Sequence, residues 1–161
     1  MDPSPTPGRR PPGRRDIARR ALGGAAIALL PPGVARATPE SMKAAIDAIL
    51  GGVAAREGRV VLDLPPLVEN GNSVSLTVSV DSPMTAADHV VAIHVVNEKN
   101  PQPQVFSATL GPRAGKATIT TRIRLGDSQR VVAIARLSDG SFWTASAEAI
   151  VTLAACLEEL T

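Results

Sequence analysis

The stretch that decides the fold reads Val74-Ser75-Leu76-Thr77-Val78-Ser79-Val80. Every second side chain is apolar, and the side chains between them are serine or threonine. Because successive side chains of a strand point to opposite faces, this alternation predicts a β-strand with one face in a core and the other in water. The sequence therefore predicts a core built from sheets.

Six further stretches have the length and composition of strands, and turn-forming residues separate them. The stretches are 60–62, 90–96, 105–110, 117–125, 131–137 and 142–153, and the turns include Asn70-Gly71, Asp81-Ser82-Pro83, Asn100-Pro101, Gly111-Pro112 and Asp139-Gly140. Residues 90–96 are the most continuously apolar, as expected of a central strand. Asp139-Gly140, between two strands, predicts a hairpin turn. Seven short strands at regular intervals indicate an all-β, immunoglobulin-like antiparallel sandwich, without the cysteine pair of antibody domains.

One amphipathic helix precedes the strands. Thr38 is a suitable N-cap, Pro39 suits a first turn, and Gly51-Gly52 ends the pattern, so the helix is expected over Pro39–Leu50. Its apolar residues share one face and predict packing against an apolar surface; they are Met42, Ala45, Ile46, Ile49 and Leu50.

The first 37 residues have the order of a secretory signal. Arginine pairs at 9–10, 14–15 and 19–20 precede a short apolar run over 21–30, and Ala35-Arg36-Ala37 offers a cleavage site. Residues 14–18 fit the twin-arginine signal, which exports folded proteins, although any of the three pairs could be the one recognised. The apolar run is too short for a membrane anchor. We therefore expect three parts: a cleaved export signal (1–37), a helix-plus-sandwich domain (38–152) and a C-terminal arm (153–161).

Removal of the signal changes the charge of the protein. The signal holds seven of the 17 basic residues and two of the 15 acidic ones, so the remainder carries a net charge of −3. The whole chain has two phenylalanines, one tryptophan and no tyrosine. Without a basic surface or a set of aromatic side chains, nucleic acid is not an expected partner.

The sequence offers little catalytic chemistry. His89 and His94 are five residues apart, at the start of an apolar strand and within it, and no carboxylates or second cysteine join them at metal-ligand spacing. A metal held by these histidines is therefore the weakest interpretation, and no cofactor is expected. Arg122 and Arg124 share a strand face and could bind an anion, but a solvated pair or an interface ion pair is favoured. We expect a protein that is not an enzyme.

Cys156 is the only cysteine and the sixth residue from the end of the chain. In an exported protein a single thiol cannot close an internal disulfide, so it needs another explanation. It could stand on a free arm as a reactive group. Alternatively, the set Leu153, Cys156, Leu157 and Leu160 could form a helical turn that buries the thiol. Periodicity alone leaves both readings open.

The mature chain resembles the SoxY family, the periplasmic carrier proteins of bacterial sulfur oxidation. The resemblance rests on the order and spacing of several short segments together with the near-terminal cysteine: Val68–Gly71, Val80–Thr85, Asn100-Pro101, Thr121–Leu125 and Asp139-Gly140. It implies an immunoglobulin-like sandwich in the periplasm that pairs with a SoxZ-like subunit. It also implies that Cys156 holds a sulfur intermediate covalently, in oxidation of the thiosulfate type, while periplasmic enzymes dock transiently with the arm.

The arm departs from the usual pattern of the family. Typical members end in Gly-Gly-Cys-Gly-Gly, whereas this chain has Ala154-Ala155 before Cys156 and Leu157-Glu158-Glu159 after it. The ending is similar to a SoxY-related subgroup whose arm reads Ala-Ala-Cys-Ile-Glu. Alanine and leucine favour a helix over a loose tether, and the two glutamates disfavour a nearby thiolate. A carrier for a different group or pathway therefore stays open, as does a binding or structural module with Cys156 buried.

Overall fold

The computed structural model of the protein describes residues 36–155. The strand β4 (Val74–Val80) forms as its alternation predicts, with the valines and Leu76 buried and the polar side chains facing outward. It is the middle strand of a three-stranded antiparallel sheet, between β2 (Val60–Asp63) and β7 (Thr118–Ile123).

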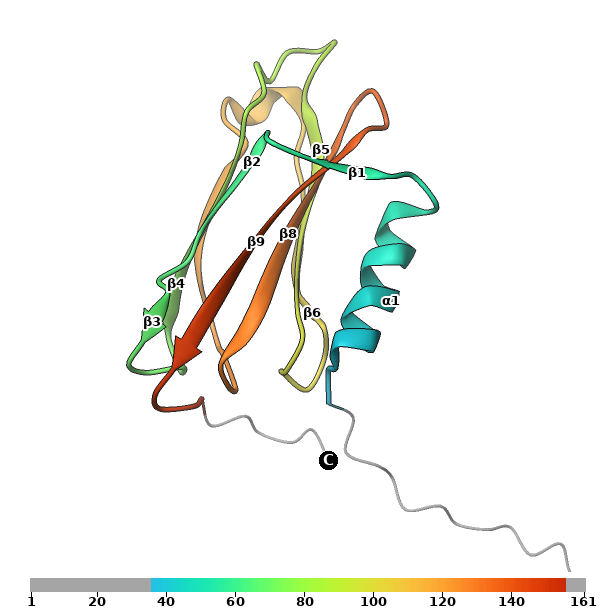
Figure 1. The fold of residues 1–161 in the computed structure, drawn as a ribbon. Helices are drawn as coiled ribbons and strands as arrows, with labels where there is room; N and C mark the ends of the chain where they lie inside the picture. The colour runs from blue at the N-terminus through green and yellow to red at the C-terminus, as the bar shows by residue number, and fades with distance from the viewer. Residues whose placement is uncertain (1–35, 156–161) are drawn as a thin grey trace, which may run out of the picture. The chain divides into compact units, whose positions relative to one another are not determined.

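The second sheet is larger and faces the first. Its strands lie in the order β1 (Ala55–Glu57), β9 (Phe142–Val151), β8 (Gln129–Leu137), β5 (Val90–Asn97) and β6 (Gln104–Thr109), and the two-residue strand β3 (Leu67–Val68) also pairs with β9. A short 3-10 helix, η2 (Pro112–Ala114), lies between β6 and β7. Figure 1 shows the two sheets packed face to face, which confirms the predicted sandwich.

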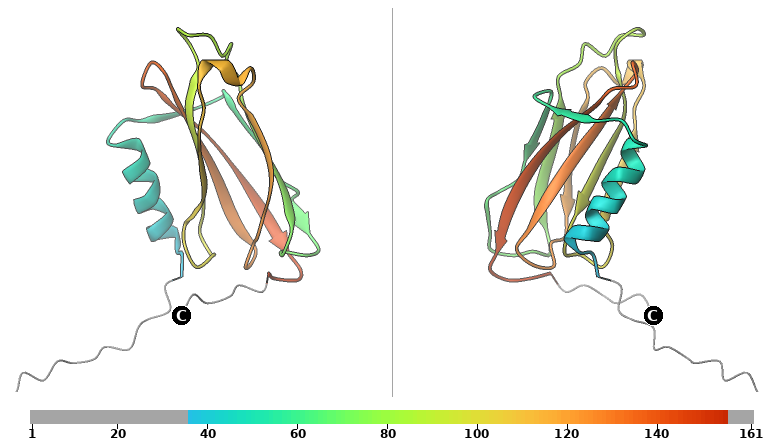
Figure 2. Two further views of the ribbon diagram at one scale, coloured as in Figure 1. Left: turned by 180° about the vertical axis from the view of Figure 1, so that it is seen from behind. Right: turned by 45° about the vertical axis from the view of Figure 1, so that its right-hand side comes forward.

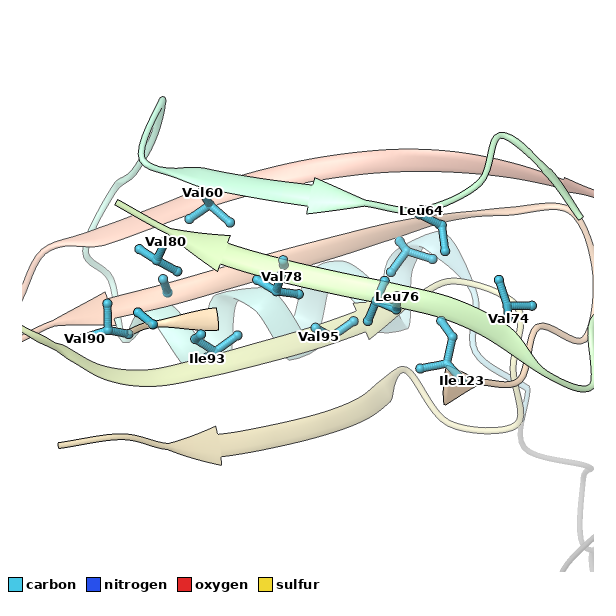
Figure 3. Close-up of a cluster of buried hydrophobic side chains, with 14 of the residues drawn as sticks. Val60, Leu64, Val74, Leu76, Val78, Val80, Val90, Ile93, Val95 and Ile123 are labelled. Atoms are coloured by element: carbon cyan, nitrogen blue, oxygen red, sulfur yellow. The ribbon is translucent and has the colours of Figure 1, made fainter. Parts of the chain in front are cut away.

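The main core fills the space between the sheets. Figure 3 shows side chains of β4 and β5 pointing toward one another there, among them Val78 and Val95. Ile123 of β7 and Leu64, which follows β2, contribute from the smaller sheet's side. This apolar burial is the main favourable term in the folding of such a sandwich.

The helix α1 (Pro39–Leu50) has the predicted bounds and caps. The Thr38 hydroxyl accepts a hydrogen bond from the Ser41 amide at 3.2 Å, and Gly51, at φ 58°, ends the helix by donating its amide to the Asp47 carbonyl. Met42 and Ala45 are buried against the outer face of the larger sheet. Figure 2 shows α1 on the side of this sheet opposite the smaller sheet.

The strand β8 supplies both cores. Val131, Ala133, Ala135 and Leu137 face the smaller sheet, whereas Val132 and Ile134 face α1. Burial on both faces explains the nearly continuous apolar sequence of this strand, because neither face is left for polar side chains. The predicted central strand, β5, has the same character: Val95 faces the sandwich core and Val96 faces α1.

The structure differs from the prediction in three details. It has nine strands among the described residues, because β1 and β3 were missed; both pair parallel to β9, in a sheet that is otherwise antiparallel. The last strand ends at Val151 and not at Leu153. The hairpin at Asp139-Gly140 forms, but four residues separate β8 from β9, and Gly140 adopts φ 82°.

We expect Met42→Ala to lower the free energy of unfolding by about 2 to 5 kcal/mol, because the side chain is 1% exposed and its removal leaves a cavity between α1 and the sheet. Urea unfolding followed by circular dichroism measures this loss. The neighbouring Lys43→Ala is the control: it removes an exposed ion pair with Asp47 and should change the free energy by about 0.5 kcal/mol or less. Equal effects of the two changes would contradict the described packing of α1.

Candidate functional site at the root of the C-terminal arm

Cys156 lies outside the described residues, and so does the rest of the predicted arm after Ala155. The structure therefore describes the first three residues of the predicted arm, 153–155, and we call these together with Thr152, the last residue of the predicted domain, the root of the arm. The Thr152 amide donates to the Val68 carbonyl at 3.0 Å, and the Thr152 hydroxyl donates to the Glu69 carbonyl at 3.2 Å. These bonds continue the pairing of β3 with β9 beyond the end of β9.

Three more backbone hydrogen bonds hold the root. The Gly71 amide donates to the Leu153 carbonyl at 2.8 Å, and the Leu125 amide donates to the Gly71 carbonyl at 2.9 Å. The Ala155 amide donates to the Leu125 carbonyl at 3.1 Å. We call Gly71, Leu125, Leu153 and Ala155 the root clamp. The chain is thus bonded to the sandwich up to the residue that precedes Cys156.

Gly71 is the residue in the middle of the root clamp. A Cβ atom at this position would lie 2.3 Å from the Leu125 carbonyl oxygen and 2.8 Å from the Ala155 nitrogen, so no side chain fits. The predicted Asn70-Gly71 turn is present, since the Asn70 side chain accepts a hydrogen bond from the Asn72 amide at 3.0 Å. The turn alone does not account for the glycine, which is required because three chain segments meet there.

A buried polar network supports the same end of the sandwich. The Gln129 side chain, 4% exposed, accepts from the Lys99 amide and donates to the Asn100 side chain, each at 3.0 Å. Asn100 in turn donates to the Arg124 carbonyl at 2.9 Å and accepts from the Gly126 amide at 3.0 Å. Asn100 therefore holds the segment on both sides of Leu125.

Two charged groups lie at the edge of this network. The Lys99 ammonium lies 3.1 Å from a carboxylate oxygen of Asp127. This hydrogen bond, together with one from the Ser128 amide, keeps the pKa of the Asp127 carboxyl below its usual value. Because both side chains are largely exposed, the pair adds little to stability.

Apolar side chains are exposed beside the root. Leu67 and Ile150, which are register partners in β3 and β9, are 59% and 61% exposed, and Leu153 is 61% exposed. Ile150 also lines an open depression of about 220 Å³, together with Glu98, Arg130 and Glu148. Exposed apolar side chains in one region are typical of surfaces that contact other proteins.

Three of the segments that carry the family resemblance meet at this end of the molecule. Val68–Gly71 and Thr121–Leu125 contribute to the root clamp, and Asn100 holds the latter segment in place. The other two, Val80–Thr85 and Asp139-Gly140, lie at the opposite end of the sandwich (Figure 1). The family resemblance rests on these segments, but nothing in the amino-acid sequence indicates that three of them are neighbours in space.

The structure does not bring the two histidines into a common site. The His94 ring lies 2.8 Å from the Ser107 hydroxyl, and its burial, together with the nearby charge of Arg136, lowers its pKa below the usual value. His89 precedes β5, and its Nδ1 is buried without a hydrogen-bond partner among residues 36–155. Within this range no three His, Cys, Asp or Glu side chains are grouped as metal ligands.

Arg122 and Arg124 are both exposed. Arg122 donates to the Ser73 hydroxyl at 3.3 Å. Neither arginine forms an ion pair with another residue of the described part. No helix within residues 36–155 is long and apolar enough to cross a membrane.

Comparison with known proteins identifies a family. The family model "Sulfur oxidation protein SoxY" matches residues 46–156, a range that ends at Cys156. Among solved structures, the sulfur carrier protein SoxY from Chlorobium limicola f thiosulfatophilum is 25% identical, with a TM-score of 0.59, over 71% of this chain and 98% of that one. No curated protein matches the chain at a significant level.

Two superoxide reductases share the fold. The enzyme from Ignicoccus hospitalis is 20% identical with a TM-score of 0.53, over 58% of this chain and 80% of that chain. A putative superoxide reductase from Thermotoga maritima is 21% identical with a TM-score of 0.50, over 61% of this chain and 87% of that chain. At such identities the likeness concerns the sandwich alone and indicates nothing about chemistry.

We expect the free energy of unfolding to fall as the pH drops below about 6.5, and His94→Gln to reduce this fall. The pKa of His94 is lowered in the folded state. As the pH falls, the unfolded chain therefore binds a proton at this histidine before the folded chain does, and the bound proton stabilises the unfolded chain relative to the folded one. Urea unfolding at pH 7.5 and 5.5 measures the difference. An identical pH dependence in the original and the His94→Gln protein would show that burial of this ring has no such effect.

Proposed function

We infer the function of this chain from a premise that its family match establishes: the chain belongs to the SoxY family of sulfur oxidation proteins. As a member it is a carrier in sulfur oxidation and not a catalytic enzyme. We propose that Cys156 is the attachment point, and that it holds a sulfur-containing group covalently while partner enzymes act on that group.

One observation carries this proposal: the last described residue, Ala155, is bonded to the sandwich directly before the only thiol of the chain. Covalent geometry places the Cα atom of Cys156 about 3.8 Å from that of Ala155. The described chain therefore ends at a fixed point at one end of the sandwich, one residue before the proposed attachment point. Such a placement suits presentation to another protein better than it suits a core position.

The proposed cargo is a sulfur compound of the thiosulfate type. In loading, a bond forms between the Cys156 thiolate sulfur and the outer sulfur of thiosulfate, which gives a cysteine S-thiosulfonate. The two reactants together give up two electrons in this step, so the loading enzyme must contain an electron acceptor. The carrier itself supplies only the thiol and its position.

We further propose that the protein works in the periplasm with a SoxZ-like subunit and with enzymes that dock at the arm. The exposed apolar side chains of Leu67, Ile150 and Leu153 support contact with proteins at this end. The arginine-rich start of the chain supports export by the twin-arginine route. Because that route exports folded proteins, a SoxZ-like subunit without a signal can be exported while it is bound to the carrier.

Protein isolated from cells grown on thiosulfate should carry a mass adduct on Cys156 that a thiol reductant removes. Intact-mass and peptide mass spectrometry measure it. The matched control, Cys156→Ser combined with Thr161→Cys, keeps one thiol but moves it five residues along. This variant should react with iodoacetamide yet carry little adduct.

The carrier proposal fails if Cys156 is unmodified under every sulfur-feeding condition and sulfur oxidation continues in the Cys156→Ser strain. Slow labelling of Cys156 by iodoacetamide in the folded protein, with fast labelling after unfolding, would instead favour the module with a buried thiol. Rapid labelling in the folded state would eliminate that alternative.

Export and pairing can be tested together. The chain is co-expressed with a SoxZ-like subunit that has no signal of its own, and both proteins are measured in the periplasmic fraction. Each of the three arginine pairs is replaced in turn by Lys-Lys. Replacement of the pair that the export machinery recognises should abolish export of both proteins, and replacement of either other pair should leave export intact. Periplasmic carrier without the second subunit would contradict the proposed pair.

A further inference from the structure

The root clamp joins three segments that are far apart in the sequence. Gly71 follows β3, Leu125 follows β7, and Leu153 and Ala155 follow β9. Gly71 donates to the arm through its amide and accepts from Leu125 through its carbonyl, so both of its backbone polar groups are used. The Leu125 carbonyl then accepts from Ala155. The arm root is thereby bonded to both of the other segments.

The segments that form the clamp are themselves held in place. The Leu125 side chain is fully buried in the sandwich core, and Asn100 bonds the backbone on either side of it. The Asn70 side chain closes the turn that contains Gly71. Ala155, the last described residue, is buried, at 9% exposed. The arm root is therefore attached to a rigid support.

We propose that Gly71 is a positioning residue for the Cys156 thiol, and that the root clamp fixes the point and direction at which the thiol-bearing chain leaves the sandwich. That a fixed position of the thiol serves the transfer of sulfur rests on the proposed function. The clamp itself rests on the contacts of Gly71, which leave no room for a Cβ atom between the Leu125 carbonyl and the Ala155 amide.

The single cysteine makes the test direct, because a nitroxide disulfide reagent labels only Cys156 in the otherwise unaltered protein. In Gly71→Ala the label should move faster, with loss of the slow component of its electron paramagnetic resonance spectrum. The Ala155 amide should exchange its hydrogen about tenfold faster or more, because its bond to Leu125 opens locally. Hydrogen exchange followed by nuclear magnetic resonance measures the second effect.

Two glycines elsewhere serve as matched controls. Gly111→Ala adds a Cβ in open space at an ordinary backbone angle, so it should change neither readout. Gly140→Ala also meets open space, but its φ of +82° strains the hairpin at the far end of the sandwich. It should lower overall stability while the label mobility and the Ala155 exchange stay as they were. If the changes in Gly71→Ala came only from a general loss of stability, Gly140→Ala would show the same changes in label mobility and in Ala155 exchange.

Ala155→Pro covers the case in which Gly71→Ala does not fold. It removes the amide that donates to Leu125, near the end of the chain, and should free the label in the same way. The proposal is overturned if the Ala155 amide exchanges at the unprotected rate in the unaltered protein, or if both variants leave label mobility unchanged. These readouts need no sulfur chemistry, so an unloaded Cys156 would refute the carrier function and leave the clamp intact.

Discussion

Burial of β8 on both faces is the constraint on which the rest of the structure depends. One face of the strand closes the core between the sheets and the other receives α1. Its antiparallel neighbours β5 and β9 are positioned by it, and β9 leads directly to the arm. Gln129, at the start of β8, is buried with hydrogen-bond partners, but a polar side chain at Val131, Ala133 or Ala135 would lose its water among apolar neighbours, so the run that follows has to be apolar.

Much of the fold could be predicted because its signals are local. The alternation of β4 and the caps of α1 are each contained in about ten residues, and the structure agrees with both. The strands β1 and β3 gave no such signal. They are held by backbone hydrogen bonds to β9. Nearly every residue type has the same backbone donor and acceptor, so such bonds produce no recognisable sequence pattern.

The site was predictable only in part, for the same reason. A lone cysteine at the end of the chain pointed to the arm, and the family resemblance singled out Val68–Gly71 and Thr121–Leu125. That Gly71 bonds to Leu153, and Leu125 to Ala155, depends on contacts between segments far apart in the chain. The glycine was assigned to its turn because a turn is the commonest local reason for Asn-Gly. Its tight contacts become apparent only once the sheets are assembled.

If Cys156 holds the carried group as we propose, the hydrogen bonds that anchor the chain up to Ala155 make the tether of that group short. A long swinging arm would let an enzyme stay at a distance, whereas an enzyme that served the proposed carrier would have to bring the entrance of its pocket up to the sandwich. Such an entrance has to be shallow, and its rim has to match the end of the carrier in shape. Discrimination among client enzymes then depends on the carrier's end surface as much as on the chemistry of the thiol.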